Sequence, residues 1–115
     1  MLFRSFLIFF LLQTATKSFA QTKFDTDSAF QVARTLAFNG KRAEARIILR
    51  KILELKPNDT DVQTLLGRTY SWDGKYDSAK TELRDAVSKS PKNEDATNAL
   101  IDAELWSDNY PAALV

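Results

Sequence analysis

The middle of the chain carries apolar and small side chains at helical spacing in two successive stretches, separated by a short break around the sequence WDGKY. Side chains three and four residues apart share one face of a helix, so the pattern predicts helices over about 60–72 and 76–89. In the break, Gly74 can take the left-handed conformation that ends a helix, and Asp73 before it is a common turn former. The positions that carry the pattern are Leu65, Leu66, Thr69 and Tyr70 in the first stretch and Ala79, Leu83, Ala86 and Val87 in the second.

The same features recur with a period of about 34 residues, which indicates a repeat array. Each repeat is predicted to hold two helices, with a proline after the second and a capping residue before the next. Asn93 can cap in this way after Pro91, and one of Asn58, Asp59 and Thr60 can do so after Pro57. Residues related by the period are Gly40 and Gly74, Ala45 and Ala79, Leu49 and Leu83, Pro57 and Pro91, Tyr76 and Tyr110, and the series Phe38, Trp72 and Trp106.

This period predicts an all-α fold and divides the chain into segments. We assign residues 1–20 to a signal peptide, 21–25 to a linker, 26–59 to the first repeat, 60–93 to the second and 94–115 to a partial third. The last residues, PAALV, stop early in the expected second helix of the third repeat. Because repeat arrays need polar ends, we expect either a truncated chain or an end covered by a partner, with self-association through that end as one route.

These residues resemble the tetratricopeptide repeat family. The middle copy matches the pattern of that family through Leu66, Gly67, Tyr70, Ala79, Leu83, Ala86 and Pro91, and the first copy matches more loosely through Val32, Ala33, Leu36, Ala45, Leu49, Ile52 and Pro57. The resemblance implies a helix–turn–helix solenoid whose structural positions include Gly40, Ala45, Pro57, Gly67, Tyr70, Gly74, Ala79 and Pro91. The third copy departs from the pattern, because Ile101 stands at the small-residue position and Asp108 at the glycine position. We therefore expect altered packing and a different turn there.

A narrower resemblance lies in the phrases LGRTYSWDGKYDSA and NALIDAELWSDNY. Together they are similar to the periplasmic repeat region of the YaiO family of bacterial outer-membrane β-barrel proteins. This resemblance implies a repeat region that follows a signal peptide and precedes a barrel. The barrel would have to lie beyond residue 115, because this chain has no series of ten-residue segments that alternate apolar and polar side chains.

The start of the chain supports export. A short basic start, an apolar run and a polar stretch ending in small residues form the pattern of a signal peptide, and Ser18 and Ala20 favour cleavage before Gln21. An uncleaved anchor is the alternative, but the apolar run is too short for the roughly 20-residue helix that spans a bilayer. We expect a periplasmic location, associated with the outer membrane.

The composition restricts the chemistry. The 115 residues contain neither cysteine nor histidine, so disulfides, thiolate nucleophiles, histidine relays and nearly all structural zinc sites are excluded, and we expect no cofactor. Without residues 1–20 the chain has 14 basic and 15 acidic residues, a net charge of −1. That balance gives no field to gather nucleic acid or an anionic membrane. Asp102 and Glu104 point to different helix faces, so we expect a binding protein and not an enzyme.

In tetratricopeptide arrays the first helix of each repeat lines a concave groove, which makes these helices the candidate binding surface here. They carry a stripe at i, i+4 and i+8 that stacks from repeat to repeat: Phe30, Arg34 and Phe38; Thr64, Arg68 and Trp72; Asn98, Asp102 and Trp106. An aromatic row beside an arginine row can hold an extended peptide or a glycan. The alternative is that the aromatics pack within their own repeats and the charges are solvated.

A second row of basic residues is expected to face solvent without a role in binding. Arg42, Arg46 and Arg50 are spaced at i and i+4 on a second helix, outside the expected groove, and we interpret them as a solvated face. The function predicted from the sequence is an exported interaction module, placed in the periplasmic N-terminal region of an outer-membrane barrel protein. The alternatives are a free-standing periplasmic adaptor and a glycan-binding module of a polysaccharide-export system.

Overall fold

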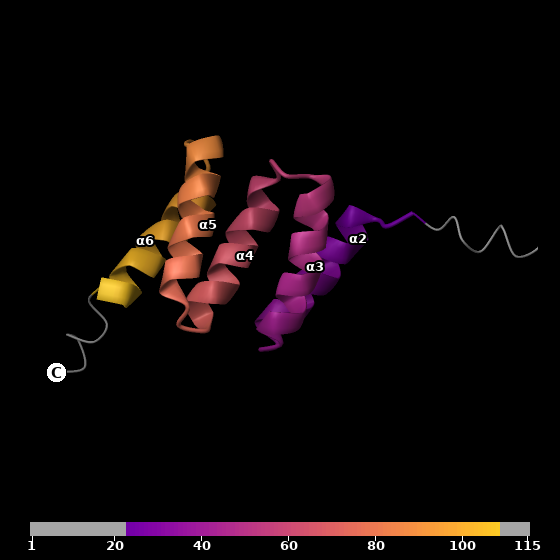
Figure 1. Ribbon diagram of the computed structural model, residues 1–115, viewed down its shortest axis with the longest axis horizontal. Helices are drawn as coiled ribbons and strands as arrows, with labels where there is room; N and C mark the ends of the chain where they lie inside the picture. Colours follow the sequence, from indigo (N-terminus) through magenta and orange to yellow (C-terminus); the bar gives the residue numbers. More distant parts are fainter. Residues whose placement is uncertain (1–22, 109–115) are drawn as a thin grey trace, which may run out of the picture.

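The computed structural model describes residues 23–108, and this part of the chain consists of five α-helices without a strand. The helices lie side by side in chain order, each antiparallel to the one before it (Figure 1). Their bounds are α2 (Thr26–Phe38), α3 (Arg42–Leu55), α4 (Thr60–Trp72), α5 (Tyr76–Lys89) and α6 (Glu94–Asp108). The all-α solenoid predicted from the sequence is therefore confirmed, and α4 and α5 are the helices expected over 60–72 and 76–89.

The helix boundaries have the local causes that the sequence indicates. Gly40 and Gly74 both have positive φ, at 84° and 72°, a conformation that side chains with a Cβ rarely adopt. The backbone N–H of Lys75 donates to the carbonyl of Tyr70 at 2.9 Å across the second of these turns. The two glycines therefore end α2 and α4 and reverse the chain into α3 and α5.

The first helix of each repeat begins with a capping side chain. Asp25 accepts from the backbone N–H of Asp27 at 3.0 Å, Asp59 from that of Val62 at 3.2 Å, and Asn93 from that of Ala96 at 3.1 Å. The three capping residues are themselves one repeat period apart. Hydrogen bonds from Ser28 and Asp27 stabilise the ionised carboxylate of Asp25 and hold its pKa below its usual value.

Helix α4 lies at the centre of the packing, in contact with α2, α3, α5 and α6. The first helices α2, α4 and α6 form one layer, and α3 and α5 form the other; in Figure 1, α3 lies in front of α2 and α5 in front of α6. The core runs through both layers as one cluster. Its most completely buried large side chains are Leu49, Ile52, Leu66, Leu83 and Val62.

Gly67 allows α4 and α5 to approach closely. A Cβ at this position would lie 2.5 Å from both Cγ and Cδ2 of Leu83, a side chain that is fully buried. The absence of a side chain at Gly67 therefore permits the close packing of these two helices. In the third repeat, Ile101 at the same position is half exposed, so its packing differs from that of Ala33 and Gly67.

The arginine row on α3 is the main correction to the sequence interpretation. Arg46 is only 7% exposed, so it is not part of a solvated face. Its guanidinium donates to the carbonyl of Thr69 at 3.1 Å and to the Asp73 carboxylate at 2.8 Å, and it stacks on the Tyr70 ring at 4.8 Å. Arg42 binds the other oxygen of Asp73 at 2.6 Å. Arg42 and Arg46 thus join the first repeat to the turn of the second, whereas Arg50 is exposed as expected and only approaches the Tyr70 ring, at 5.5 Å.

The equivalent positions of the next repeat also form a contact, but a weaker one. Lys80 and Ser107 stand one repeat period after Arg46 and Asp73, and the Lys80 ammonium donates to the Ser107 hydroxyl at 3.1 Å. An arginine with a carboxylate thus becomes a lysine with a neutral hydroxyl. We expect the junction between the first two repeats to be the stronger of the two.

Other expectations lie outside the described residues. These are the signal peptide, the cleavage before Gln21, the turn after Asp108 and the packing of the PAALV end. Among residues 23–108, no helix is both long enough and apolar enough to cross a membrane.

Replacing Gly67 by alanine should destabilise the fold. Overpacking against Leu83 costs about 1–3 kcal/mol, whereas the better helix propensity of alanine returns about 1 kcal/mol. Urea unfolding should therefore show a net loss for Gly67→Ala. In a Leu83→Ala background the clash is absent, so the same change should stabilise; destabilisation in both backgrounds would refute the close contact.

Replacing Asp73 by asparagine should also destabilise the fold, because it removes the charged partner of a buried arginine. We expect a loss of about 1–3 kcal/mol in urea unfolding at pH 7. Glu104→Gln is the matched control. It removes the partner of Arg84, 2.9 Å away in a pair with both side chains exposed, and should cost less than about 1 kcal/mol.

This loss should depend on pH. Desolvation raises the pKa of Asp73, but the hydrogen bonds and charges of Arg42 and Arg46 outweigh it, so the pKa lies below the usual 3.8. The advantage of wild type over Asp73→Asn should be complete above that usual value and disappear as the pH falls through the lower folded pKa. An advantage that does not change with pH between neutrality and acid would contradict the ion pair.

Candidate partner-binding groove

A hollow of about 370 Å³ lies on the layer formed by the first helices. Five of the nine residues predicted for the groove line it, and they come from α2 and α4. The complete lining consists of Phe30, Arg34, Phe38, Asp61, Leu65, Arg68, Trp72 and Asp95. The structure thus brings the first predicted stripe and two of the three residues of the second together in one concave surface.

The other four predicted residues lie elsewhere. Thr64 is only 1% exposed, so a partner in the groove could not reach it. Asn98 lines a separate hollow with Pro91 and Lys92. Trp106 is part-buried on α6 and is not among the residues that line the groove hollow. Asp102 is connected to the groove only through Arg68, which it approaches at 3.7 Å.

The aromatic row is a pair and not a continuous ladder. The rings of Phe38 and Trp72 have centroids 5.6 Å apart and planes tilted by 48°. Phe38 is 66% exposed, whereas Trp72 is partly buried against the core. The pair therefore offers one apolar contact at the turn end of the groove, with the Phe38 ring facing solvent.

The sequence interpretation missed an acidic row across the same helices. Asp27, Asp61 and Asp95 lie one repeat period apart in the first turns of α2, α4 and α6, and the last two line the hollow. The spacing was visible in the sequence. Acids are common in first turns because they complement the helix dipole, so the row had an ordinary explanation and was not assigned to the groove.

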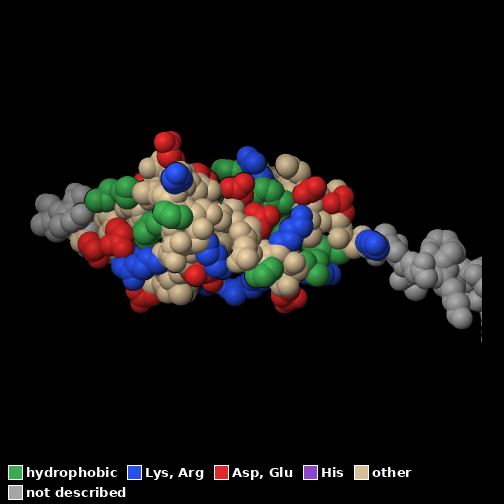
Figure 2. Space-filling model, turned by 90° about the horizontal axis from the view of Figure 1, so that it is seen from above, with side chains coloured by type: hydrophobic (Ala, Val, Ile, Leu, Met, Phe, Trp, Pro, Cys, Tyr) green, Lys and Arg blue, Asp and Glu red, His purple; other side chains and the backbone are tan. Residues whose placement is uncertain are grey.

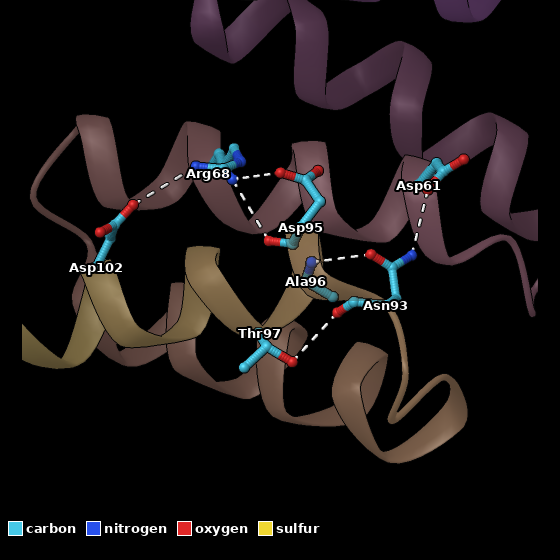
Figure 3. A network of polar contacts seen from close by, with 7 residues as sticks. All are labelled: Asp61, Arg68, Asn93, Asp95, Ala96, Thr97 and Asp102. Atoms are coloured by element: carbon cyan, nitrogen blue, oxygen red, sulfur yellow. Dashed lines mark hydrogen bonds and ion pairs between the residues drawn. The ribbon is translucent and has the colours of Figure 1, made fainter.

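Arg68 is held by carboxylates from α6 (Figure 3). One guanidinium nitrogen lies 2.5 Å from Asp95, which is exposed, and the other lies 3.7 Å from Asp102. Nearby, the Asn93 amide donates to Asp61 at 3.4 Å. The charge of Arg68 is therefore largely neutralised within the protein.

Arg34 has different surroundings. Its guanidinium carbon lies 5.9 Å from the centroid of the Phe30 ring on its own helix. Within residues 23–108, Arg34 forms no ion pair. The groove thus contains one arginine paired with acids and one that, among residues 23–108, lies near an aromatic ring and forms no ion pair.

The chemistry of the groove suits binding. Its side chains offer stacking on aromatic rings and fork-shaped hydrogen bonds from guanidinium groups. Residues 23–108 contain no grouping of acidic side chains that could hold a metal ion. On the face in Figure 2, acidic and basic side chains alternate over short distances, unlike the continuous basic surface that gathers nucleic acid.

Comparison with known families supports this fold. The tetratricopeptide repeat model matches residues 26–59, which hold α2 and α3. Repeats of this family generally mediate contacts between proteins, and the all-helical solenoid described above is similar to an array of such repeats. No curated protein matches the chain. The fold is an all-α helical solenoid, and the match over one repeat suggests a protein-interaction module.

Proposed function

We propose that this chain is an exported interaction module that binds an extended segment of a partner protein in the groove of α2, α4 and α6. The observation that carries this proposal is the hollow of about 370 Å³ that combines the exposed Phe38 ring, Trp72 and two arginines. Apolar rings beside hydrogen-bond donors are what an extended peptide needs, because it presents side chains and backbone carbonyls together.

The dimensions fit such a segment. Three neighbouring helices with axes about 8–10 Å apart span roughly 20 Å. An extended chain covers about 3.3–3.6 Å per residue, so about six residues would cross the groove. A contact of this length is short, which favours a reversible interaction.

A glycan is the second candidate ligand, but it has less support. Sugars stack on flat, accessible ring faces, whereas Phe38 and Trp72 are tilted against each other and Trp72 is partly buried. Peptide side chains pack against tilted rings without this restriction. The aromatic pair therefore favours the peptide.

We further propose that the module works in the periplasm as the N-terminal region of an outer-membrane barrel protein. The signal-peptide pattern of residues 1–20 supports export, and the resemblance of LGRTYSWDGKYDSA and NALIDAELWSDNY to the YaiO family supports the barrel context. A free-standing periplasmic adaptor is the alternative placement.

Peptide binding can be tested with a displayed library of random dodecapeptides. Selected peptides should bind the purified protein, and Phe38→Ala should weaken them about tenfold, as for a central aromatic contact. Ile47→Ala is the control, because Ile47 is 71% exposed but lies on α3 in the opposite layer. Equal losses in both variants, or equal binding of soluble oligosaccharides at the same site, would contradict the peptide proposal.

The location can be tested by fractionating cells of the native host and blotting with an antibody against residues 23–108. A band much larger than 115 residues in the outer membrane, with its mature N-terminus at Gln21, is the expected result. A small soluble periplasmic band would replace the barrel placement by the adaptor. A cytoplasmic band that retains residues 1–20 would contradict export.

A further inference from the structure

The two groove arginines occupy equivalent repeat positions but have different neighbours. Arg68 contacts Asp95 and Asp102 on the following first helix. Asp61 and Arg68 lie one repeat period before Asp95 and Asp102, so they are the residues in the corresponding positions around Arg34. One of the two acids is thus replaced by a cation, and Arg34 cannot form the double contact that holds Arg68.

Two further differences keep Arg34 away from the remaining acid. Asp61 accepts a hydrogen bond from the Asn93 amide, which satisfies part of its carboxylate (Figure 3). Phe30 stands where the second repeat has the buried Thr64, and its ring gives Arg34 an alternative contact at 5.9 Å. In the structure Arg34 and Asp61 both line the hollow without an ion pair between them.

We propose that Arg34 is the anion-recognition residue of the groove and that it receives a carboxylate of the bound segment, whose neighbouring apolar side chain packs on Phe38. Arg68 does not take this role, because it is already paired with Asp95 and Asp102. This inference rests on the proposed peptide function and specifies which chemistry the peptide carries.

Competition among carboxylates explains the division of roles. A carboxylate that approaches Arg68 would have to displace Asp95 and Asp102, so it exchanges one ion pair for another. At Arg34 a carboxylate can form two parallel hydrogen bonds with a guanidinium that has no ion pair within residues 23–108. The net gain on binding is therefore larger at Arg34.

The remaining charges limit how many acids the segment carries. Asp61 and Asp95 line the same hollow and repel further carboxylates. We therefore expect a segment with a single Asp or Glu flanked by uncharged residues, and not an acidic run.

The test uses octapeptide libraries with acetylated N-termini and amidated C-termini, so that only side chains supply carboxylates. Each library fixes Asp, Glu, Asn or Gln at one position and varies uncharged residues elsewhere. Wild type should prefer the acid over its amide at one position by about tenfold, the scale of one charged, bidentate contact. Arg34→Gln should abolish that preference, and Arg68→Gln should retain it.

Two controls separate recognition from folding. Circular dichroism and thermal unfolding of each variant verify the fold. Asp95→Asn changes an exposed carboxylate and releases one contact of Arg68, so it should preserve or increase the preference for acids.

A parallel library with free C-termini shows whether a chain end can supply the carboxylate. Selectivity that appears only in this library, and that is lost in Arg34→Gln, would support the site and assign the anion to a chain end.

The outcomes distinguish this inference from the function on which it rests. If wild type binds no library, the peptide function fails and the inference fails with it. If wild type binds peptides without preferring acids, or if Arg34→Gln keeps the preference, only the role of Arg34 is overturned. Equal loss of the preference in folded Arg34→Gln and Arg68→Gln would also overturn it, because the two arginines would then act alike.

Discussion

The burial of α4 is the constraint on which the rest of the structure depends. This helix packs against both helices of the first repeat and both that follow it, so it buries side chains around most of its circumference. Gly67 gives it room against α5, and the side-chain nitrogen of Gln63 donates to Glu82 and Asp85 on α5 at 3.1 and 2.8 Å. Because α4 carries the middle of the groove, its packing places Arg68 and Trp72.

The junctions between repeats set the relative placement of the groove helices. Arg46 crosses from α3 to the end of α4, where it meets a carbonyl, a carboxylate and an aromatic ring. Its counterpart Lys80 crosses from α5 to a single hydroxyl on α6. Helix α6 is also tied to the second repeat by ion pairs, from Arg68 on α4 to Asp95 and Asp102 and from Arg84 on α5 to Glu104, and these pairs are more exposed than that of Arg46.

A repeat gives similar side chains to each first helix, and the groove acquires its character where the copies differ. Acids recur at the first turns, but the arginine position carries Arg34, Arg68 and then Asp102. Each arginine stands next to the residue at the same position of the following copy. For Arg68 that residue is the acid Asp102, whereas for Arg34 it is the cation Arg68. The difference between the two arginines therefore follows from the order of the copies.

The sequence by itself determined the helices, their turns and their caps, because these depend on residues within one or two helical turns. The spacing of apolar positions predicted α4 and α5, Gly74 ended the first of them, and Asn93 capped the next. Five groove residues also followed from the repeat period. Only the tertiary structure decided that Arg46 is buried, that Thr64 is inaccessible and that Arg68 is paired, because each depends on side chains that other helices and turns bring close, such as Asp73 beside Arg46 and Asp95 beside Arg68.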